Sequence, residues 1–129
     1  MVERAKGGIY SSLEVNRGLP APYLNKYFEK FESGWRIHED IKKMVEFSEM
    51  NLAKPWPYLP KMDIIFLRNV MIYLDVETKK EILKRIRQLL SPDGCLFLGG
   101  AETTLNLDES FERVQSGKAW YYRLRKGGV

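Results

Sequence analysis

The sequence has very few of the residues that build disulfide bridges and metal centres. It contains one cysteine, Cys95, and one histidine, His38, in 129 residues. A single cysteine excludes an internal disulfide and a cysteine-based zinc cage. No partners for a metal site or a Ser-His-Asp triad accompany His38 at suitable spacing. We therefore predict no metal site, and we interpret Cys95 as a core thiol and His38 as an ordinary surface or loop residue.

Long hydrophobic runs and dense basic clusters are also missing. No apolar run approaches the roughly 20 residues that cross a bilayer, and no signal-peptide pattern follows Met1. We therefore expect a cytoplasmic protein without membrane insertion. Lys and Arg are scattered along the chain, so we expect no nucleic-acid partner. The net charge of +4 is mild; it would help to steer an acidic partner and also serves solubility.

The composition is that of an ordinary soluble protein. Hydrophobic residues make up 44% of the chain and charged residues 29%, which is usual for a globular domain. A chain of this length forms one domain or a large part of one. It can bury roughly two thirds of its unfolded surface, which is enough for a hydrophobic core.

The most informative stretch is the apolar run Met62–Leu67, which ends in Arg68 and Asn69. A near-continuous apolar run predicts a strand buried on both faces, as in the centre of a parallel sheet. Ligands of open α/β sheets bind just beyond the carboxyl ends of such strands. Arg68 and Asn69 are therefore candidate ligand-binding residues. The alternative is that both residues hydrogen-bond loop backbone, as many residues at strand ends do.

A helix and a second strand follow this run. Asp75 is a suitable N-cap, and residues 76–90 carry apolar side chains at helical spacing. The Ser91–Gly94 segment predicts a turn that stops the helix, and Cys95–Leu98 predicts a short strand. Together these elements form a βαβ unit, whose crossover is almost always right-handed.

Shorter elements are predicted on either side of the βαβ unit. Val2–Lys6 reads as a helix that ends at two glycines. Ser33-Gly34 predicts a hairpin turn between Lys26–Phe31 and Trp35–Ile37, and Met44–Met50 predicts a further strand. Near the C-terminus, the segments Phe111–Gln115 and Ala119–Leu124 predict a hairpin around Ser116–Lys118.

Several blocks, in order, closely resemble the chemotaxis receptor methyltransferases of the CheR family. The central blocks are F-L-R-N-V-M-I-Y-L-D and L-S-P-D-G-C-L-F-L-G-G-A-E-T. Upstream blocks are E-R-A-K-G-G-I-Y, R-G-L-P-A-P-Y-L-N-K-Y-F and V-E-F-S-E-M-N-L, so the resemblance covers nearly the whole chain. It implies S-adenosylmethionine as the cofactor and methylation of glutamates on the cytoplasmic helices of chemoreceptors.

The resemblance also implies a fold. We expect an α/β protein with a partial Rossmann-like sheet of the class I S-adenosylmethionine methyltransferases, a small antiparallel β insertion within residues 26–50 and a C-terminal antiparallel hairpin. Residues 1–129 would form the C-terminal part of such a domain. Some members of the family have a longer glycine-containing loop in the insertion that supports binding of a receptor tether peptide. This chain has only Glu32–Gly34 there, so we do not expect tether binding.

Site residues follow from the same resemblance. It places Asn51 and Leu52 beside the adenine ring, Arg68 and Asn69 in the wall of the cofactor pocket, and Tyr73 near the transferred methyl group. We expect Tyr73 to be catalytic, because its hydroxyl can orient the acceptor carboxylate. The alternatives are that Asn51 satisfies a turn, that Arg68 is structural and that Tyr73 is a core residue.

Two parts of such a cofactor site are not found in the sequence. It has no glycine-rich loop after a first strand, where the backbone approaches the cofactor closely. It also has no matching acidic residue for the ribose hydroxyls. We therefore expect a fragment of a larger enzyme, inactive by itself. The alternatives are a non-catalytic module that docks receptors or another protein, and part of a methyltransferase for a small molecule.

By the resemblance, Met1 falls just after the second strand of the cofactor domain, and the first strand would normally pair with Met62–Leu67. One edge of Met62–Leu67 would carry unpaired backbone groups, each costing roughly 1–3 kcal/mol if buried, and an exposed apolar edge recruits another strand. We expect the edge to be covered. Pairing with Val45–Met50 in a monomer is slightly favoured over self-association with a second copy.

Overall fold

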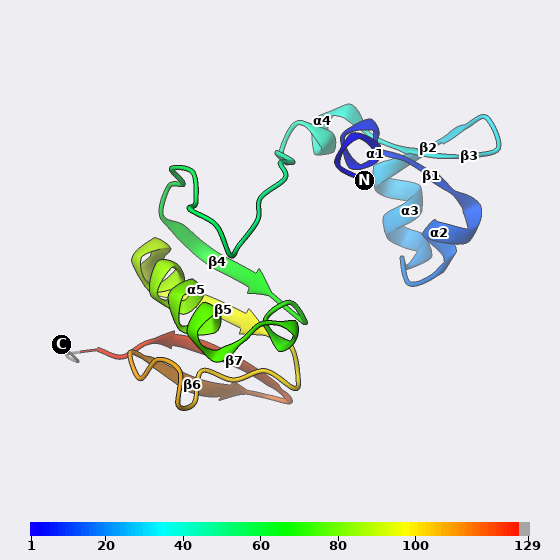
Figure 1. Cartoon of the computed structure of the whole chain (residues 1–129). Coiled ribbons are helices and arrows are strands. Elements are labelled where there is room, and N and C mark those ends of the chain that lie inside the picture. The colour runs from blue at the N-terminus through cyan, green and yellow to red at the C-terminus, as the bar shows by residue number, and fades with distance from the viewer. Residues whose placement is uncertain (127–129) are drawn as a thin grey trace. The chain divides into compact units, whose positions relative to one another are not determined.

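The computed structural model describes residues 1–126. The chain divides into two compact units, Met1–Met50 and Asn51–Val129. Each unit has its own β-sheet (Figure 1).

The first unit combines short helices with a small antiparallel sheet. Its helices are α1 (Val2–Gly7), α2 (Ser12–Asn16), α3 (Ala21–Tyr27) and α4 (Glu39–Lys42). Its strands are β1 (Ile9–Ser11), β2 (Phe28–Phe31) and β3 (Gly34–Ile37), in the order β1-β3-β2 with antiparallel pairing. The predicted hairpin is confirmed, and β1 joins it as a third strand. The sequence of Ile9–Arg17 predicts a loop with a helical turn, whereas the structure has β1 and α2 there.

Gly34 explains how β1 approaches the hairpin. A Cβ at this position would overlap the main-chain carbonyl of Tyr10, so a glycine is needed where β3 pairs with β1. Across the other pair of strands, the Glu29 carboxylate accepts hydrogen bonds from the Arg36 guanidinium at 3.0 and 2.7 Å. Such a cross-strand pair supports the register of the hairpin.

The second unit contains the βαβ unit and the terminal hairpin. Its elements are β4 (Met62–Leu67), the 3-10 helix η1 (Met71–Tyr73), α5 (Val76–Leu89), β5 (Leu90–Leu98), β6 (Phe111–Ser116) and β7 (Ala119–Leu124). The sheet has the order β4-β5-β7-β6 (Figure 1); β4 and β5 are parallel and the other pairs antiparallel. The predicted parallel unit and antiparallel hairpin are both confirmed.

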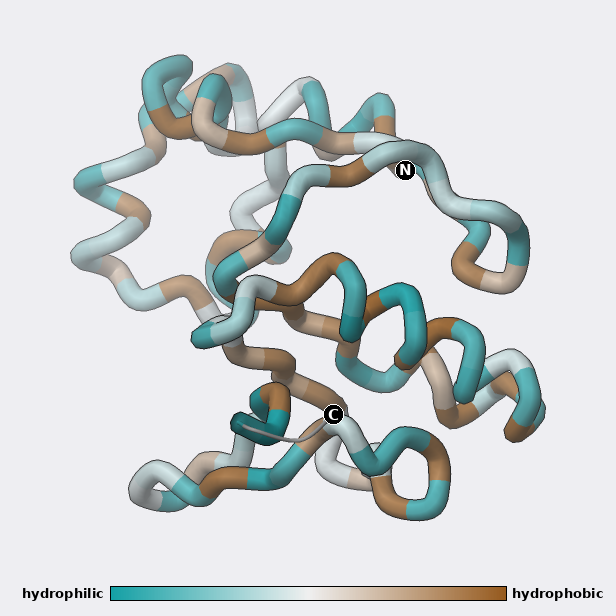
Figure 2. The backbone as a smooth tube through the Cα atoms, turned by 90° about the vertical axis from the view of Figure 1, so that its left-hand side faces the viewer, coloured by the Kyte–Doolittle hydropathy of each residue, from teal (hydrophilic) through white to brown (hydrophobic). Residues whose placement is uncertain are grey.

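Helix α5 covers one face of this sheet. The Asp75 carboxylate caps it by accepting a hydrogen bond from the Thr78 N–H at 2.8 Å. Hydrophobic and hydrophilic residues alternate along the helix (Figure 2), and Ile82, Leu83 and Ile86 are buried. The buried core that they share contains Leu67, Met71, Ile82, Leu83, Ile86, Leu90, Leu96, Leu98, Phe111 and Tyr122.

The turn predicted at Ser91–Gly94 is wrong. The chain passes from α5 directly into β5, which starts at Leu90. Leu90 pairs with Met62, and Cys95 pairs with Ile64. The residues Ser91–Gly94 between them form an irregularity in the ladder. At this point β5 passes close to the backbone of β4: a Cβ on Gly94 would lie 2.9 Å from the Asp63 carbonyl oxygen.

The expectation that β4 is buried on both faces is also wrong. Ile64 is 56% exposed and Phe66 70% exposed, whereas Leu67 on the α5 side is buried. Only the face under α5 is covered among the described residues of this unit. The apolar run therefore predicted the strand correctly but not its surroundings.

Residues 44–50 form no strand, which contradicts the predicted strand Met44–Met50 and the predicted pairing of Val45–Met50 with β4. The reason is that a strand needs a neighbour for its backbone groups, and this segment has none in either sheet of the described chain. In the described part of the chain, β4 pairs with β5 alone and lies at the edge of its sheet. Self-association at this edge stays a prediction.

Candidate functional site

The carboxyl ends of the two parallel strands lie side by side. Leu67 at the end of β4 pairs with Leu98 at the end of β5. Arg68 and Gly99 therefore leave the sheet at neighbouring points. This is the edge at which open α/β sheets bind ligands.

Asn69 turns the chain sharply after β4. Its φ is 61°, in the left-handed region that asparagine tolerates better than most residues. Its side-chain oxygen lies against Gly99, where a Cβ would overlap it. The Asn69 side chain thus faces the end of β5, and the absence of a Cβ on Gly99 makes room for it.

Glu102 joins the two strand ends. Its carboxylate accepts hydrogen bonds from the backbone N–H groups of Asn69 at 2.6 Å, Met71 at 2.9 Å and Gly99 at 2.8 Å. The backbone N–H of Glu102 in turn donates to the Gly99 carbonyl at 3.0 Å. The Glu102 carboxylate is thereby fixed by its own turn and shared between two segments that are distant in sequence.

The electrostatics of this carboxylate favour its charged form. Partial burial raises the pKa of Glu102, but hydrogen bonds from the backbone of Asn69, Gly99, Met71 and Ile72 outweigh this effect. The pKa therefore lies below its ordinary value of 4.5. Glu102 is an anion at neutral pH and can accept from all of these groups.

Tyr73 lies in the loop that these bonds hold. It is the last residue of η1, whose Met71 is only 1% exposed, whereas Tyr73 is 82% exposed. The short helix is therefore buried at its first residue, Met71, and exposes the Tyr73 side chain at its last. Tyr73 is not packed in the core of this unit, and its catalytic role stays a prediction.

A hollow of about 330 Å³ lies at the same end of the strands. Phe66 and Phe97, whose rings stack with centroids 4.9 Å apart, line it together with Arg68, Gly99 and Glu102. Aromatic rings beside charged groups can hold a ligand that has both apolar and polar parts.

Asn51 and Leu52 have local roles in the structure. The Asn51 side-chain oxygen accepts a hydrogen bond from the Ala53 N–H at 3.0 Å, as in an Asx turn. The Leu52 carbonyl accepts from the Trp56 indole at 2.9 Å, and the Leu52 side chain packs against the core. Within residues 1–126, no hydrogen bond links this turn to Arg68 or Asn69. Contact of Asn51 and Leu52 with the cofactor therefore stays a prediction.

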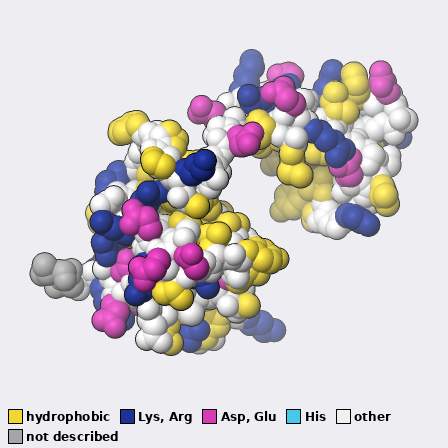
Figure 3. Space-filling view, in the orientation of Figure 1, with side chains coloured by type: hydrophobic (Ala, Val, Ile, Leu, Met, Phe, Trp, Pro, Cys, Tyr) yellow, Lys and Arg dark blue, Asp and Glu magenta, His cyan; other side chains and the backbone are white. Residues whose placement is uncertain are grey.

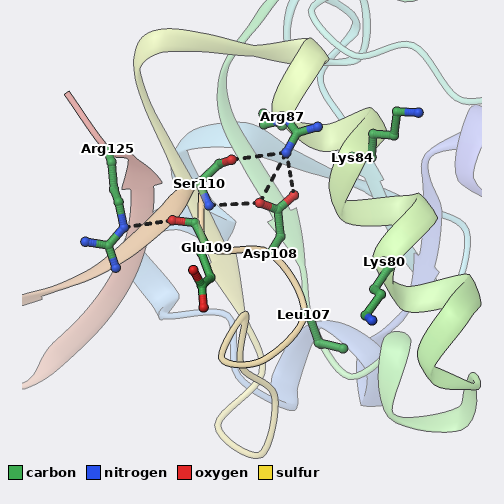
Figure 4. Close-up of a pocket in the computed structure, with 8 residues that line it drawn as sticks. All are labelled: Lys80, Lys84, Arg87, Leu107, Asp108, Glu109, Ser110 and Arg125. Atoms are coloured by element: carbon green, nitrogen blue, oxygen red, sulfur yellow. Dashed lines mark hydrogen bonds and ion pairs between the residues drawn. The ribbon is translucent and has the colours of Figure 1, made fainter. Parts of the chain in front are cut away.

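A second hollow, of about 580 Å³, lies beside α5 (Figure 4). Arg87 donates hydrogen bonds to both carboxylate oxygens of Asp108, at 3.3 and 3.1 Å, and to the Ser110 hydroxyl at 3.1 Å. Arg125 donates to the Glu109 carbonyl at 2.8 Å. These groups bind one another and tie α5 to the segment before β6, so we assign them a structural role.

Within residues 1–126, no group of three or more His, Cys, Asp or Glu side chains is placed to hold a metal ion. No helix in the same residues combines the length and the apolar character needed to span a membrane.

A parallel βαβ unit with polar groups at its carboxyl edge, extended by an antiparallel hairpin, is consistent with part of a Rossmann-like methyltransferase sheet. Residues 1–120 match the family model described as CheR methyltransferase, SAM binding domain. The chain belongs to the CheR methyltransferase family, and S-adenosylmethionine is the cofactor of that domain.

Curated relatives agree with the family match. The chain is 39% identical over 126 residues to chemotaxis protein methyltransferase 1 of Pseudomonas aeruginosa and 38% identical to Cher2 of Pseudomonas putida. Both matches cover 97% of this chain and 46% of the relative. The chemotaxis protein methyltransferase of Escherichia coli is 38% identical over 116 residues, or 86% of this chain and 40% of the relative. The chain thus spans about half the length of the curated relatives it matches.

The residues at the strand ends fit one side of a site for this cofactor. The turn that contains Asn69 and Tyr73 is hydrogen-bonded to the Glu102 carboxylate, and the hollow beside the strand ends has polar and aromatic walls. The sequence contains no glycine-rich strand-to-helix loop that would cradle the rest of the molecule. Contact of Arg68 and Asn69 with the cofactor stays a prediction.

Sequence reasoning missed Glu102. It appeared only within the block L-S-P-D-G-C-L-F-L-G-G-A-E-T, with no role of its own. An acidic residue shortly after a parallel strand is a usable signal, because neighbouring strand ends expose unpaired N–H groups. Its partners Asn69 and Met71, however, are 33 and 31 residues away along the chain.

Proposed function

We propose that this chain is the C-terminal part of an S-adenosylmethionine-dependent methyltransferase that esterifies glutamate side chains of chemoreceptors. The observation that carries the proposal is the exposed Tyr73 at the carboxyl edge of the sheet, in a turn that is hydrogen-bonded to Glu102. The chain that forms this turn belongs to the CheR family. Relatives that are 38–39% identical to the chain over the matched residues are named chemotaxis protein methyltransferases.

The proposed methyl transfer needs little general acid or general base catalysis from the protein. The cofactor supplies an electrophilic methyl group on a sulfonium ion. A glutamate carboxylate is ionised at neutral pH and is already a nucleophile, so no strong base is needed. Positioning and exclusion of water then provide much of the rate. In this proposal the Tyr73 hydroxyl donates a hydrogen bond to one oxygen of the acceptor carboxylate and so orients the other oxygen toward the methyl group.

Arg68 and Asn69 form the wall beside this position. Arg68 lines the hollow and adds positive charge at the edge where an acidic acceptor would arrive. Asn69 holds the wall closed against the end of β5. Under the proposal Asn51 and Leu52 lie beside the adenine ring in the complete enzyme.

The proposed partner is a cytoplasmic receptor helix that bears glutamates, and the proposed location is the cytoplasm. The net charge of +4 is complementary to such a helix.

The test is transfer of a labelled methyl group by the complete product of the gene. The complete gene product is incubated with methyl-labelled cofactor and a receptor cytoplasmic fragment. Base-labile methyl esters on glutamate side chains of the receptor fragment are the expected result. A receptor fragment with its acceptor glutamates replaced by glutamine is the control. Receptor binding without transfer would favour the alternative of a non-catalytic docking module. Transfer to a small carboxylic acid but not to receptor would favour the small-molecule alternative.

A further inference from the structure

The Glu102 carboxylate is built into the loop that carries two of the predicted site residues. It accepts from the N–H of Asn69 itself and from the N–H of Met71, the first residue of η1. The same short helix is closed by a hydrogen bond from the Leu74 N–H to the Met71 carbonyl at 3.0 Å, and Tyr73 lies within it. Movement of Glu102 would therefore release both Asn69 and the helix that presents Tyr73.

The third hydrogen bond gives this loop a fixed reference. The Gly99 N–H donates to the same Oε1 that accepts from Asn69, at 2.8 Å. Gly99 follows directly after β5, whose Leu98 is paired with Leu67 in β4. The carboxylate thus connects a loop with an unusual backbone angle at Asn69 to a strand end inside the sheet.

We infer that Glu102 is the positioning residue of this site, and that it acts on methyl transfer through Asn69 and Tyr73. The catalytic part of this inference rests on the proposed function. Glu102 need not touch cofactor or substrate, because its hydrogen-bonding capacity is used on the backbone. A neutral glutamine would present one carbonyl oxygen and one N–H₂ group. The N–H₂ group would then face either the Met71 N–H or the Asn69 and Gly99 N–H groups, and donors do not pair with donors.

The principal test compares Glu102→Gln with Glu109→Gln in the complete gene product. Glu109 is an exposed glutamate seven positions further on, and its contact with Arg125 uses the backbone carbonyl and not the carboxylate. We expect Glu102→Gln to lower turnover roughly tenfold or more, which corresponds to a barrier increase of about 1.4 kcal/mol. The KM for receptor should change less, and Glu109→Gln should have no effect.

A double-mutant cycle separates positioning from general stability. If Glu102 acts through Tyr73, Glu102→Gln in a Tyr73→Phe background should reduce turnover by less than about threefold, because the two losses are not independent. Losses that multiply in full would contradict the inference, as would wild-type turnover in Glu102→Gln.

Hydrogen exchange provides a readout that does not depend on activity, and its first part needs only the wild-type protein. In the wild-type protein the amides of Asn69, Met71 and Gly99 should be protected, although they lie outside the main helix and strand ladders. In Glu102→Gln their exchange should accelerate roughly tenfold or more while amides in the middle of α5 stay unchanged. Rapid exchange of all three in the wild type would overturn the inference. If the wild type transfers no methyl group but these amides are protected, only the proposed function fails.

Discussion

Asn69 and Gly99 lie against each other at the ends of two parallel strands, and the Asn69 side-chain oxygen takes the space that a Cβ on Gly99 would need. A Cβ there would also come within 2.7 Å of the Glu102 carboxylate. Three residues from two loops therefore share one close contact, and each limits what the others can be.

Replacement of Gly99 by alanine should destabilise this contact. We expect a loss of roughly 1–3 kcal/mol in the free energy of unfolding, since a methyl group in a filled space forces neighbouring atoms apart. Gly100→Ala is the matched control: a Cβ on Gly100 meets nothing within 4 Å, so its effect should stay within about 0.5–1 kcal/mol. Denaturant unfolding of both variants measures the difference, and equal losses would show that the space at Gly99 is not needed.

Replacement of Tyr73 by phenylalanine in the complete gene product tests the proposed catalytic hydroxyl. The side chain is exposed, so the fold should survive. We expect turnover to fall roughly tenfold or more, because a hydrogen bond to a charged carboxylate is lost, with little change in cofactor affinity. Tyr58→Phe, at another exposed tyrosine, is the control. Receptor methylation at the parent rate would leave Tyr73 without a catalytic role.

The isolated chain should bind S-adenosylmethionine or its demethylated product weakly. Under the proposed function, Asn51, Arg68 and Asn69 would contact only one side of the cofactor, and the sequence has no glycine-rich cofactor loop. Calorimetric titration of the chain by itself measures this affinity. Low-micromolar binding would show that these residues suffice.

The pH dependence of stability should reveal the charge on Glu102. Because its pKa is lowered from the ordinary 4.5 in the folded protein, its contribution to stability is complete above about pH 4.5 and is lost as the pH falls through the folded-state pKa. The difference in unfolding free energy between wild type and Glu102→Gln should therefore be constant from pH 7 to about pH 5 and shrink at lower pH. Other carboxylates with lowered pKa values, such as Glu14 and Asp75, cancel in this difference. A difference that grows in acid would contradict the sign.

The open edge of β4 should make the isolated chain self-associate. Hydrophobic side chains are visible at the surface of the chain (Figure 3), and Ile64 and Phe66 of β4 are among the exposed ones. Phe66→Lys should suppress association, because a charged side chain on an edge strand opposes pairing with another strand. Leu105→Lys, at an exposed loop leucine, should not. Sedimentation over a range of concentrations decides this, and a concentration-independent monomer in the wild type would contradict it.

Local signals account for the elements that sequence reasoning found. The N-cap Asp75 and the helical spacing that follows it predicted α5, and alternation around a turn predicted the β6–β7 hairpin. These elements depend on residues close together in the chain. The position of Arg68 and Asn69 after a predicted strand marked them as candidate ligand-binding residues, and the resemblance to a family then added Tyr73.

Longer-range requirements account for the errors. Residues 44–50 have a strand-like sequence, but a strand exists only beside another strand. Phe66 has the apolar character of a buried residue, yet exposure depends on what covers the face. Glu102 has no local partner other than Gly99, so its role emerges only when the loop at Asn69 is brought beside it.

The irregularity at Ser91–Gly94 separates the start of β5, where the pairing with β4 is irregular, from its end, where the pairing is regular. Four consecutive pairs, from Ile64–Cys95 to Leu67–Leu98, set the register at the far end of the strand, where the candidate site lies. Before them, the ladder already accommodates residues without partners. An insertion or deletion of one residue near Pro92 could thus be absorbed at that end, while the spacing between Arg68 and Gly99 stays unchanged. Variation in chain length would be confined to the side of the sheet away from the chemistry.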